Sequence, residues 1–308
     1  NGYDISCTGE SDGGIDLTVT GSVPSYTYSW SNNWTSASIY GITSGLYDVL
    51  ITDANGCFID TSITLTEPTP LVTTIVSTTN YNGYEVSCNG YSDGGIDLTV
   101  SGSVPTYTYL WNASGITTED IGNLSEGTYT VDITDLNSCT TSTSIVLSEP
   151  TPLQISILNV SDYNGYEVSC NGYSDGSVSV VVNGSVPSYT YLWSSAETTS
   201  AANSLESGFQ DVLVTDLNSC TIDTFIILSE PTPLVTTIVS TTNYTGYDIS
   251  CNGESDGGID LTVSGSVPSY TYSWNTSGIT TEDIGNLSEG TYTVDITDLN
   301  SCTTSTSI

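Results

Sequence analysis

Lysine, arginine, histidine and methionine are all absent from this sequence of 308 residues. Its 35 aspartates and glutamates have no cationic side chain to offset them, so the formal net charge is −35. Proteins bind nucleic acids and anionic membrane surfaces through Lys and Arg, and both kinds of binding are therefore excluded. The missing lysine also excludes a Walker-type phosphate loop and any Lys–Asn isopeptide cross-link.

The absence of these residue types also excludes most enzymatic chemistry. Without histidine and lysine there is no imidazole base, no Ser–His or Cys–His pair and no Schiff-base amine. No apolar run reaches 18 residues, so we expect no transmembrane helix. The sequence starts at Asn1 in the middle of a pattern, and we expect it to be a piece of a longer chain, with no readable targeting signal.

The residues that are present favour a folded β protein. Hydrophobic residues make up 37% of the chain, and its 21 Tyr, 5 Trp and 3 Phe exceed what a disordered polyanion carries. Thr, Ser, Val, Ile and Tyr dominate, which is typical of strands.

Eight cysteines mark an internal repeat. Successive cysteines of each of two series are 81 or 82 residues apart. We name them the early cysteines (Cys7, Cys88, Cys170, Cys251) and the late cysteines (Cys57, Cys139, Cys220, Cys302). Around the early series the chain reads, for example, YEVSCNGYSDGGIDLTV, and around the late series VDITDLNSC. The chain is therefore predicted to consist of four tandem copies of one unit.

Proline-containing connectors separate the copies. TEPTPL, SEPTPL and SEPTPL recur at 66–71, 148–153 and 229–234, and two prolines within four residues end a strand and favour a stiff connector. We predict boundaries after Pro68, Pro150 and Pro231. The domains are then repeat 1 (1–68, without its opening strand), repeat 2 (69–150), repeat 3 (151–231) and repeat 4 (232–308, stopping within its closing strand).

Within each repeat the apolar pattern has a period of two. Repeat 2 contains six such segments: LVTTIVSTT, GGIDLTVSG, TYTYLW, TTEDIGNL, GTYTVDITD and CTTSTSIVLSEP. This pattern predicts an all-β fold, a tandem array of four small immunoglobulin-like (PKD-like) β-sandwich domains. A unit of about 80 residues is only marginally stable through burial alone, so a cross-link would help it.

Three spaced motifs carry a family resemblance. C-x-G-x-S-D-G, V-P-x-Y-T-Y-x-W and G-x-Y-x-V-x-x-T-D-x-N-x-C, closed by E-P, resemble the SprB-type repeat of gliding-motility and cell-surface adhesins of Bacteroidota. The resemblance covers all four repeats. It implies a bacterial cell-surface location, export by type IX secretion and a role in long adhesive filaments.

Each repeat has one strand rich in aromatic residues. Alternation places its two tyrosines and its tryptophan on one face of the strand. They could form a sugar-stacking platform, but we favour a sandwich core, where a tryptophan on a central strand is expected. The four trios are Tyr26, Tyr28 and Trp30; Tyr107, Tyr109 and Trp111; Tyr189, Tyr191 and Trp193; Tyr270, Tyr272 and Trp274. Trp34 has no counterpart in the other repeats, and we expect it to be exposed.

Acidic loops are candidate calcium sites, because calcium takes six to eight oxygen ligands. The candidates after the early cysteines are Asp12, Asp16, Asp93, Asp97, Asp175, Asp256 and Asp260. No loop matches the EF-hand pattern. We favour turns in which these side chains bond to the local backbone, as in the D-x-N-x hairpins before the late cysteines, and we expect no cofactor.

Two carboxylate pairs, Glu119–Asp120 and Glu282–Asp283, could suggest glycosidase chemistry. Adjacent strand residues point to opposite faces, however, and repeat 3 has Glu197–Thr198 at this place. We therefore expect no enzymatic activity and no catalytic residue.

The cysteines indicate disulfides rather than a metal site, since the chain has no histidine and no C-x-x-C. We predict Cys7–Cys57, Cys88–Cys139, Cys170–Cys220 and Cys251–Cys302. Each bond lies within one repeat and closes a loop of about 50 residues, worth roughly 4 kcal/mol. This pairing requires the chain to turn back at NYNGY. If NYNGY instead continues the first strand, the early cysteine faces the next repeat, and bonds such as Cys7–Cys139 would join neighbouring repeats.

These features predict a structural segment of an extracellular stalk or filament, part of a large adhesin that supports adhesion and gliding. Its partners would be neighbouring repeats of the same chain, surface polysaccharide or copies of itself. The alternative is a calcium-dependent glycan-binding module. Repeats 2 and 4 share SGITTEDIGNLSEGTYTVDITDLNSCTTSTSI, so in that case they would bind alike.

Overall fold

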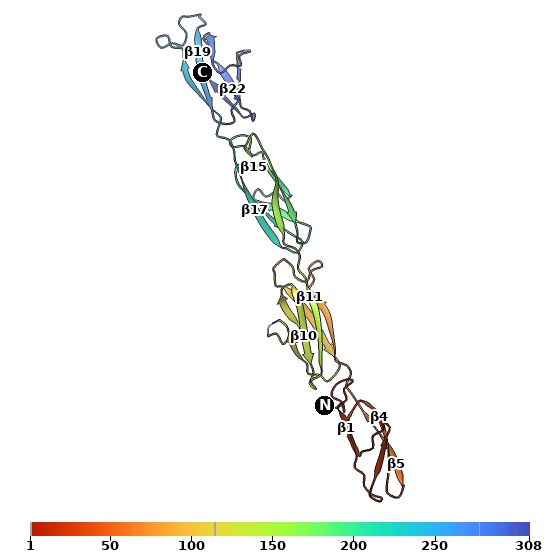
Figure 1. Ribbon diagram of the computed structural model, residues 1–308. Helices are drawn as coiled ribbons and strands as arrows, with labels where there is room; N and C mark the ends of the chain where they lie inside the picture. The colour runs from red at the N-terminus through yellow and green to blue at the C-terminus, as the bar shows by residue number, and fades with distance from the viewer. Residues whose placement is uncertain (1, 114, 277) are drawn as a thin grey trace. The chain divides into compact units, whose positions relative to one another are not determined.

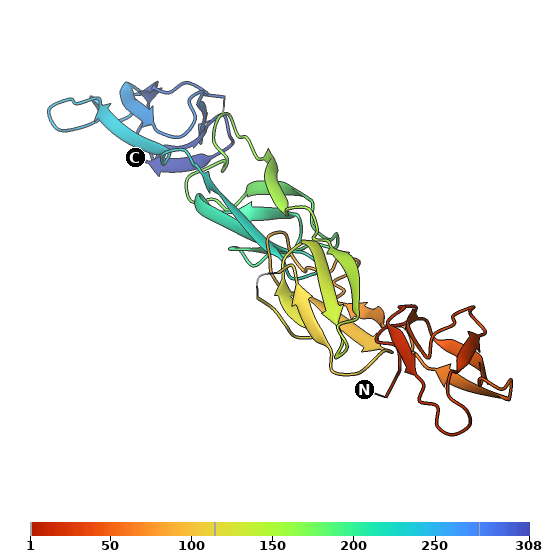
Figure 2. The same cartoon turned by 60° about the horizontal axis from the view of Figure 1, so that its bottom comes forward.

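A computed structural model describes residues 2–113, 115–276 and 278–308. They form 23 β-strands joined by turns and loops, and none of them lies in a helix (Figure 1, Figure 2). It follows that no described segment is a helix long and apolar enough to cross a membrane.

Repeat 2 shows the complete arrangement of strands. They are β6 (Val72–Thr78), β7 (Gly94–Ser101), β8 (Thr108–Trp111), β9 (Ile121–Leu124), β10 (Gly127–Thr134) and β11 (Thr140–Leu147). One antiparallel sheet has the order β6-β7-β9 and the other the order β8-β10-β11. In the second sheet Gly127 pairs with Leu147 and Thr134 with Thr140, so β10 and β11 form a hairpin closed by residues 135–139.

Repeat 3 has the same two sheets, β12-β13-β15 and β14-β16-β17. Its strands are β12 (Gln154–Val160), β13 (Gly176–Asn183), β14 (Thr190–Trp193), β15 (Ala201–Leu205), β16 (Gly208–Thr215) and β17 (Thr221–Leu228). In repeats 2 and 3, six strands lie where the alternating pattern predicts them.

Repeats 1 and 4 follow the same plan. Repeat 1 has β1 (Gly13–Asp16), β2 (Thr27–Trp30), β3 (Ser38–Ile42), β4 (Gly45–Thr52) and β5 (Phe58–Leu65). Repeat 4 has β18 (Val235–Thr241), β19 (Gly257–Ser264), β20 (Thr271–Trp274), β21 (Ile284–Leu287), β22 (Thr293–Thr297) and β23 (Thr303–Ser307). In repeat 1 the sheet β1-β3 has two described strands, whereas the corresponding sheets of the other repeats have three.

Each repeat has its own hydrophobic core between its two sheets. In repeat 2 the inward side chains of β7 and β10, such as Leu98 and Val131, surround Trp111, which is only 3% exposed. The indole Nε1–H of Trp111 donates to the Thr118 carbonyl at 2.9 Å, so its one polar group is satisfied. The fold is therefore all-β, a tandem array of four small immunoglobulin-like β-sandwiches.

The chain divides into two compact units, residues 1–150 and 151–308. Unit 1 contains repeats 1 and 2, and unit 2 contains repeats 3 and 4. The division falls after Pro150; the other two boundaries, after Pro68 and Pro231, stay predictions.

Candidate functional site: a cross-linked joint between repeats

Disulfides join neighbouring repeats. In unit 1 the bond is Cys7–Cys139, and in unit 2 it is Cys170–Cys302; each has a Cα–Cα distance of 5.6 Å and spans 132 residues. An early cysteine is thus bonded to the late cysteine of the following repeat. Cys88 and Cys220 are disulfide-bonded as well, whereas Cys57 and Cys251 are free and exposed. The predicted pairs Cys7–Cys57, Cys88–Cys139, Cys170–Cys220 and Cys251–Cys302 are therefore wrong.

The reason lies at the two ends of the closing strand. In repeat 2 the amides of Glu85 and Val86 donate to the Ser148 carbonyl, which places the early cysteine beside the residue that follows β11. The late Cys139 precedes the first residue of β11. Eight strand residues separate the two ends by about 26 Å, whereas a disulfide tolerates Cα separations of less than about 7 Å. The early cysteine thus lies at the pole where the chain leaves its repeat, opposite the late cysteine.

The loop after the early cysteine holds the connector. In repeat 1 the Gly9 amide donates to the Glu67 carboxylate and the Thr8 hydroxyl to the Pro68 carbonyl, both at 2.7 Å. In repeat 3 the Gly172 amide donates to Glu230 at 2.6 Å. The spaced C-x-G and E-P motifs are therefore two parts of one contact.

A carboxylate three positions before the early cysteine adds a second contact. Asp4 accepts from the Thr66 amide and hydroxyl at 2.8 Å, and these bonds lower the pKa of its carboxyl. In repeat 3, burial alone would raise the pKa of Glu167, but the Ser229 hydroxyl and amide hold it below its ordinary value.

The following repeat holds the other side of the connector through its G-S-V-P loop. The Ser103 amide donates to the Thr69 carbonyl at 2.9 Å. Gly102 has a φ of +83°, and a Cβ built on it would lie 1.9 Å from the Pro70 carbonyl oxygen. Unit 2 repeats this at Gly265, whose Cβ would lie 1.9 Å from the oxygen of Pro233. Only glycine allows the connector to pass this closely.

A buried aspartate shapes the hairpin that carries the late cysteine. Asp135 is 6% exposed and accepts from the amides of Val104 at 3.1 Å and of Asn137 and Cys139 at 2.8 Å. It also accepts from the Ser103 hydroxyl, which ties the hairpin to the G-S-V-P loop. The Asx turn predicted for D-x-N-x is confirmed.

An asparagine of the same hairpin reaches across to the preceding repeat. In unit 1 the Asn137 Nδ2 group donates to the Ser6 carbonyl at 2.9 Å. In unit 2 the Asn300 Nδ2 group donates to the carbonyls of Ser169 at 2.9 Å and Tyr163 at 3.0 Å. We name the whole arrangement, which comprises the connector, the two loops and the disulfide, the joint.

Replacing Asp135 by Asn should weaken this joint. Burial alone would raise the pKa of Asp135, but hydrogen bonds from Ser103, Cys139, Val104 and Asn137 hold it below its ordinary value. A depressed folded pKa stabilises the fold above the unfolded value, and this stabilisation is lost as the pH falls through the folded pKa. We expect Asp135→Asn to cost about 1–3 kcal/mol near neutral pH, measured by denaturant unfolding, because buried donors lose a charged acceptor.

The matched control is Asp132→Asn, which removes the same charge from an exposed position on β10. It should change the unfolding free energy little. The difference between the two variants should shrink as the pH falls from about 5 to about 2. A difference independent of pH over that window would contradict the role of the Asp135 charge.

The calcium candidates lie in two settings. The first aspartate of each loop bonds to the backbone before the early cysteine: Asp12 accepts from the Ser6 amide and Asp175 from the Ser169 amide. The second, where present, lies on a strand; Asp97 and Asp260 accept from serine hydroxyls of the opening strand at 3.3 Å. Within the described residues no three Asp, Glu, Cys or His side chains gather where they could hold a metal ion.

The expectation that these loops bind no calcium stays untested by the structure, and thermal melting tests it. If these carboxylates only stabilise loops, both ions act only by screening the repulsion between negative charges. Calcium should then raise the melting temperature no more than magnesium does at equal ionic strength. A saturable rise specific to calcium at sub-millimolar concentration would instead make Asp93, Asp97 and their equivalents ligands.

The remaining candidates have structural surroundings. The four trio tryptophans are buried in the cores, with the trio tyrosines packed partly buried against them, whereas Trp34 is 45% exposed, as predicted. In repeat 4 the carboxylates of Glu282 and Asp283 accept from amides of β19, those of Val263 and Leu261. In repeat 2 Asp120 accepts from the Leu98 amide in the same way.

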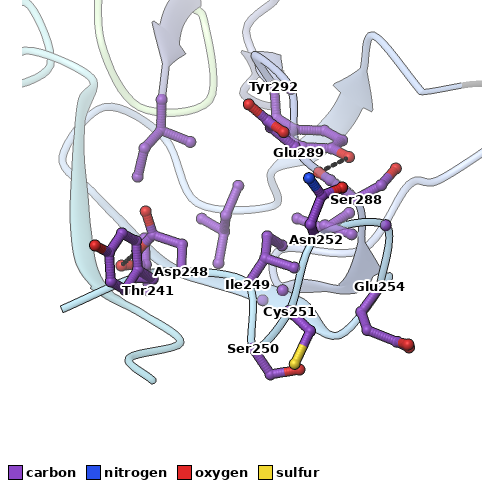
Figure 3. Close-up of a pocket in the computed structure, with 18 residues that line it drawn as sticks. Thr241, Asp248, Ile249, Ser250, Cys251, Asn252, Glu254, Ser288, Glu289 and Tyr292 are labelled. Atoms are coloured by element: carbon purple, nitrogen blue, oxygen red, sulfur yellow. Dashed lines mark hydrogen bonds between the residues drawn. The ribbon is translucent and has the colours of Figure 1, made fainter. Parts of the chain in front are cut away.

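A cavity of about 680 Å³ in repeat 4 lies beside Cys251 and is lined by Ile249, Gly257 and Leu287, among others (Figure 3). In repeats 1–3 the corresponding glycine contacts the last leucine of the closing strand, for example Gly94 with Leu147. In repeats 1–3 a leucine side chain thus occupies the place that this cavity takes in repeat 4.

Comparison with known families agrees with this geometry. The family model described as SprB repeat matches four segments, residues 3–35, 84–115, 167–198 and 243–278. Each contains an early cysteine and the aromatic strand of one repeat. The chain carries four SprB repeats. No curated protein matches the sequence.

Several solved structures show a distant likeness to the array of SprB repeats. The eight N-terminal Ig domains of Down syndrome cell adhesion molecule share 10% identity, with 97% of this chain and 66% of that chain covered and a TM-score of 0.27. Invasin, a bacterial integrin-binding protein, shares 11% identity over 92% of this chain and 71% of that chain, with a TM-score of 0.31. Domains 1–6 of the surface layer protein SbsC share 13% identity over 92% and 49% of the two chains, with a TM-score of 0.22.

Proposed function

We propose that this chain is a segment of an extracellular stalk or filament, part of a large adhesin on a bacterial cell surface that serves adhesion and gliding. The observation that carries the proposal is the joint. A covalent bond between neighbouring domains, with the connector held from both sides, lets one repeat transmit load to the next. The SprB repeats support the surface location and type IX export, and disulfides suit an oxidising, extracellular environment.

The role is mechanical rather than catalytic. The core tryptophans are buried, and the joint aspartates hold backbone amides. The charge of −35 has no counter-charge within the chain, so neighbouring stalks repel one another. Screening limits this repulsion to about 8 Å at physiological salt, and it therefore acts between surfaces that are nearly in contact. The partners of each repeat are the neighbouring repeats of its own chain.

Small-angle scattering tests whether the four repeats form an extended stalk. A repeat should span about 35–40 Å from its strands and loops, so four repeats in line should give a maximum dimension of roughly 150 Å. Because the disulfides hold the joints, this dimension should be the same at low and high salt. A particle well below about 100 Å would contradict an extended stalk.

A further inference from the structure

The outer face of the sheet β14-β16-β17 in repeat 3 is apolar. Inward residues of this sheet, such as Val212 and Val214, are buried in the core, and the residues that alternate with them face solvent. The apolar side chains among these outward residues are between 39% and 66% exposed; they are Leu192, Phe209, Leu213, Phe225 and Ile227. We name this set the apolar patch.

The apolar patch is continuous across the three strands. Leu192 of β14 pairs with Leu213 of β16. Phe209 of β16 pairs with Ile227 of β17, and its ring stacks on that of Phe225 with 5.1 Å between the ring centroids. The patch presents roughly 500 Å² of apolar surface, a size at which exposed patches are often functional. This is more than half of the roughly 800 Å² that one partner buries in a standard interface.

Repeat 2 has polar residues where repeat 3 has the two phenylalanines. Thr128 takes the place of Phe209 on the central strand, and Ser144 takes the place of Phe225 on the neighbouring strand. The two repeats nevertheless have the same two sheets and the same strand order. The fold therefore does not require the phenylalanines, and their exposure favours a role in binding.

Two carboxylates lie within the apolar patch. Asp211 lies between Phe209 and Leu213 on β16. Asp223 of β17 pairs with Leu213. Alternation along the strands directs both carboxylates to the face that carries the patch, and the chain has no lysine, arginine or histidine to pair with them. A second copy of the chain would bring only further negative charge to this face, since its formal net charge is also −35.

We propose that the apolar patch binds a protein segment in which apolar residues alternate with lysine or arginine. The apolar residues of the segment cover the phenylalanines and leucines, and its cationic groups pair with Asp211 and Asp223. This charge complementarity selects a basic partner and speeds its encounter with an acidic chain. A glycan fits less well, because no side chain of the apolar patch has a hydrogen-bonding group. The inference goes beyond the stalk role and does not depend on it.

Two short, labelled synthetic peptides of equal charge serve as probes for binding to the whole chain. One alternates leucine with lysine, and the other alternates serine with lysine. Fluorescence anisotropy measures both dissociation constants at about 0.15 M salt, where the screening length is about 8 Å. Binding that depends on net charge alone should be equal for the two peptides.

We expect the leucine–lysine peptide to bind the natural chain at least about tenfold more tightly than the serine–lysine peptide, because it covers the apolar patch. Phe209→Thr with Phe225→Ser, which introduces the residues of repeat 2, should remove this preference. The matched control is Leu110→Ser with Val146→Thr, which replaces two exposed apolar residues on the corresponding face of repeat 2 by the residues of repeat 1. This control should keep the preference.

A second pair of variants tests the carboxylates. Asp211→Thr with Asp223→Ser, again the residues of repeat 2, should weaken binding of the leucine–lysine peptide by about fivefold while leaving the apolar patch in place. Asp48→Thr with Asp60→Ser removes the corresponding two carboxylates of repeat 1, where no phenylalanine accompanies them, and should change binding by less than about twofold.

Equal affinity of the two peptides for the natural chain would overturn the proposal, as would an unchanged preference in the Phe209→Thr with Phe225→Ser variant. Tighter binding of a neutral polysaccharide such as dextran would show that the face takes a glycan instead. Dimerisation of the natural chain in analytical ultracentrifugation, abolished by the same variant, would show that a second copy is the occupant. Either result would contradict the basic segment that we propose.

Discussion

Pulling the oxidised chain by its ends should leave residues 8–138 and 171–301 unextended. Because Cys7 and Cys139 are bonded, load passes between Cα atoms 5.6 Å apart instead of through the chain between them, whose ends are separated by 132 positions. The Cys170–Cys302 bond does the same in unit 2. Once a bond is reduced, its loop can extend by about 460 Å. Single-molecule force spectroscopy with and without reductant would show this as a gain in contour length.

Cysteine variants show which disulfide causes the gain in contour length. Cys7→Ser with Cys139→Ser should lengthen the oxidised chain without reductant, but by less than full reduction does, because the Cys170–Cys302 bond and the disulfide of Cys88 remain. Cys57→Ser should change nothing, because Cys57 is free within the chain. Equal contour lengths in oxidised and reduced samples would show that the repeats are held by non-covalent contacts alone.

Replacing Gly102 by Ala should open the joint from its other side. The left-handed backbone costs a residue with a Cβ about 1–2 kcal/mol, and the clash with the Pro70 oxygen adds about 1–3 kcal/mol. We expect a total cost of about 2–5 kcal/mol in denaturant unfolding. Hydrogen exchange at the Ser103 amide, which donates to Thr69, should become faster because the connector must move away.

The variant Gly83→Ala separates the cost of the left-handed backbone from the cost of the clash with the connector. Gly83 also has a positive φ, +102°, but a Cβ there would meet nothing within 4 Å. This variant should show the backbone cost alone and leave the exchange of Ser103 unchanged. If both variants behaved alike, the close passage of the connector would contribute nothing to stability.

The sequence predicts the sandwich well because its signals are local. The alternation in GGIDLTVSG buries Ile96 and Leu98 on one face of β7, and Trp111 lies in the core that the aromatic strand indicates. The TTEDIGNL segment is less regular than predicted, since the strand covers only Ile121–Leu124. Asp120 instead bonds to the Leu98 amide, an interaction that no strand pattern reveals.

The joint could not be predicted in the same way, because it depends on which pole the early cysteine occupies. The loop entropy of a disulfide favours neither pairing clearly, at roughly 4 kcal/mol for 50 residues against about 5 kcal/mol for 132. The deciding contacts join residues about 60 positions apart, such as Gly9 and Glu67. The two motifs C-x-G and E-P were each visible, but nothing in their spacing shows that they touch.

The disulfide pattern itself is the most direct test of the joint. Because the chain has no Lys or Arg for trypsin, the oxidised protein is digested without reductant at aromatic and acidic residues and analysed by mass spectrometry. The account predicts linked peptides that contain Cys7 with Cys139 and Cys170 with Cys302. Peptides that link Cys7 with Cys57, or Cys170 with Cys220, would contradict it.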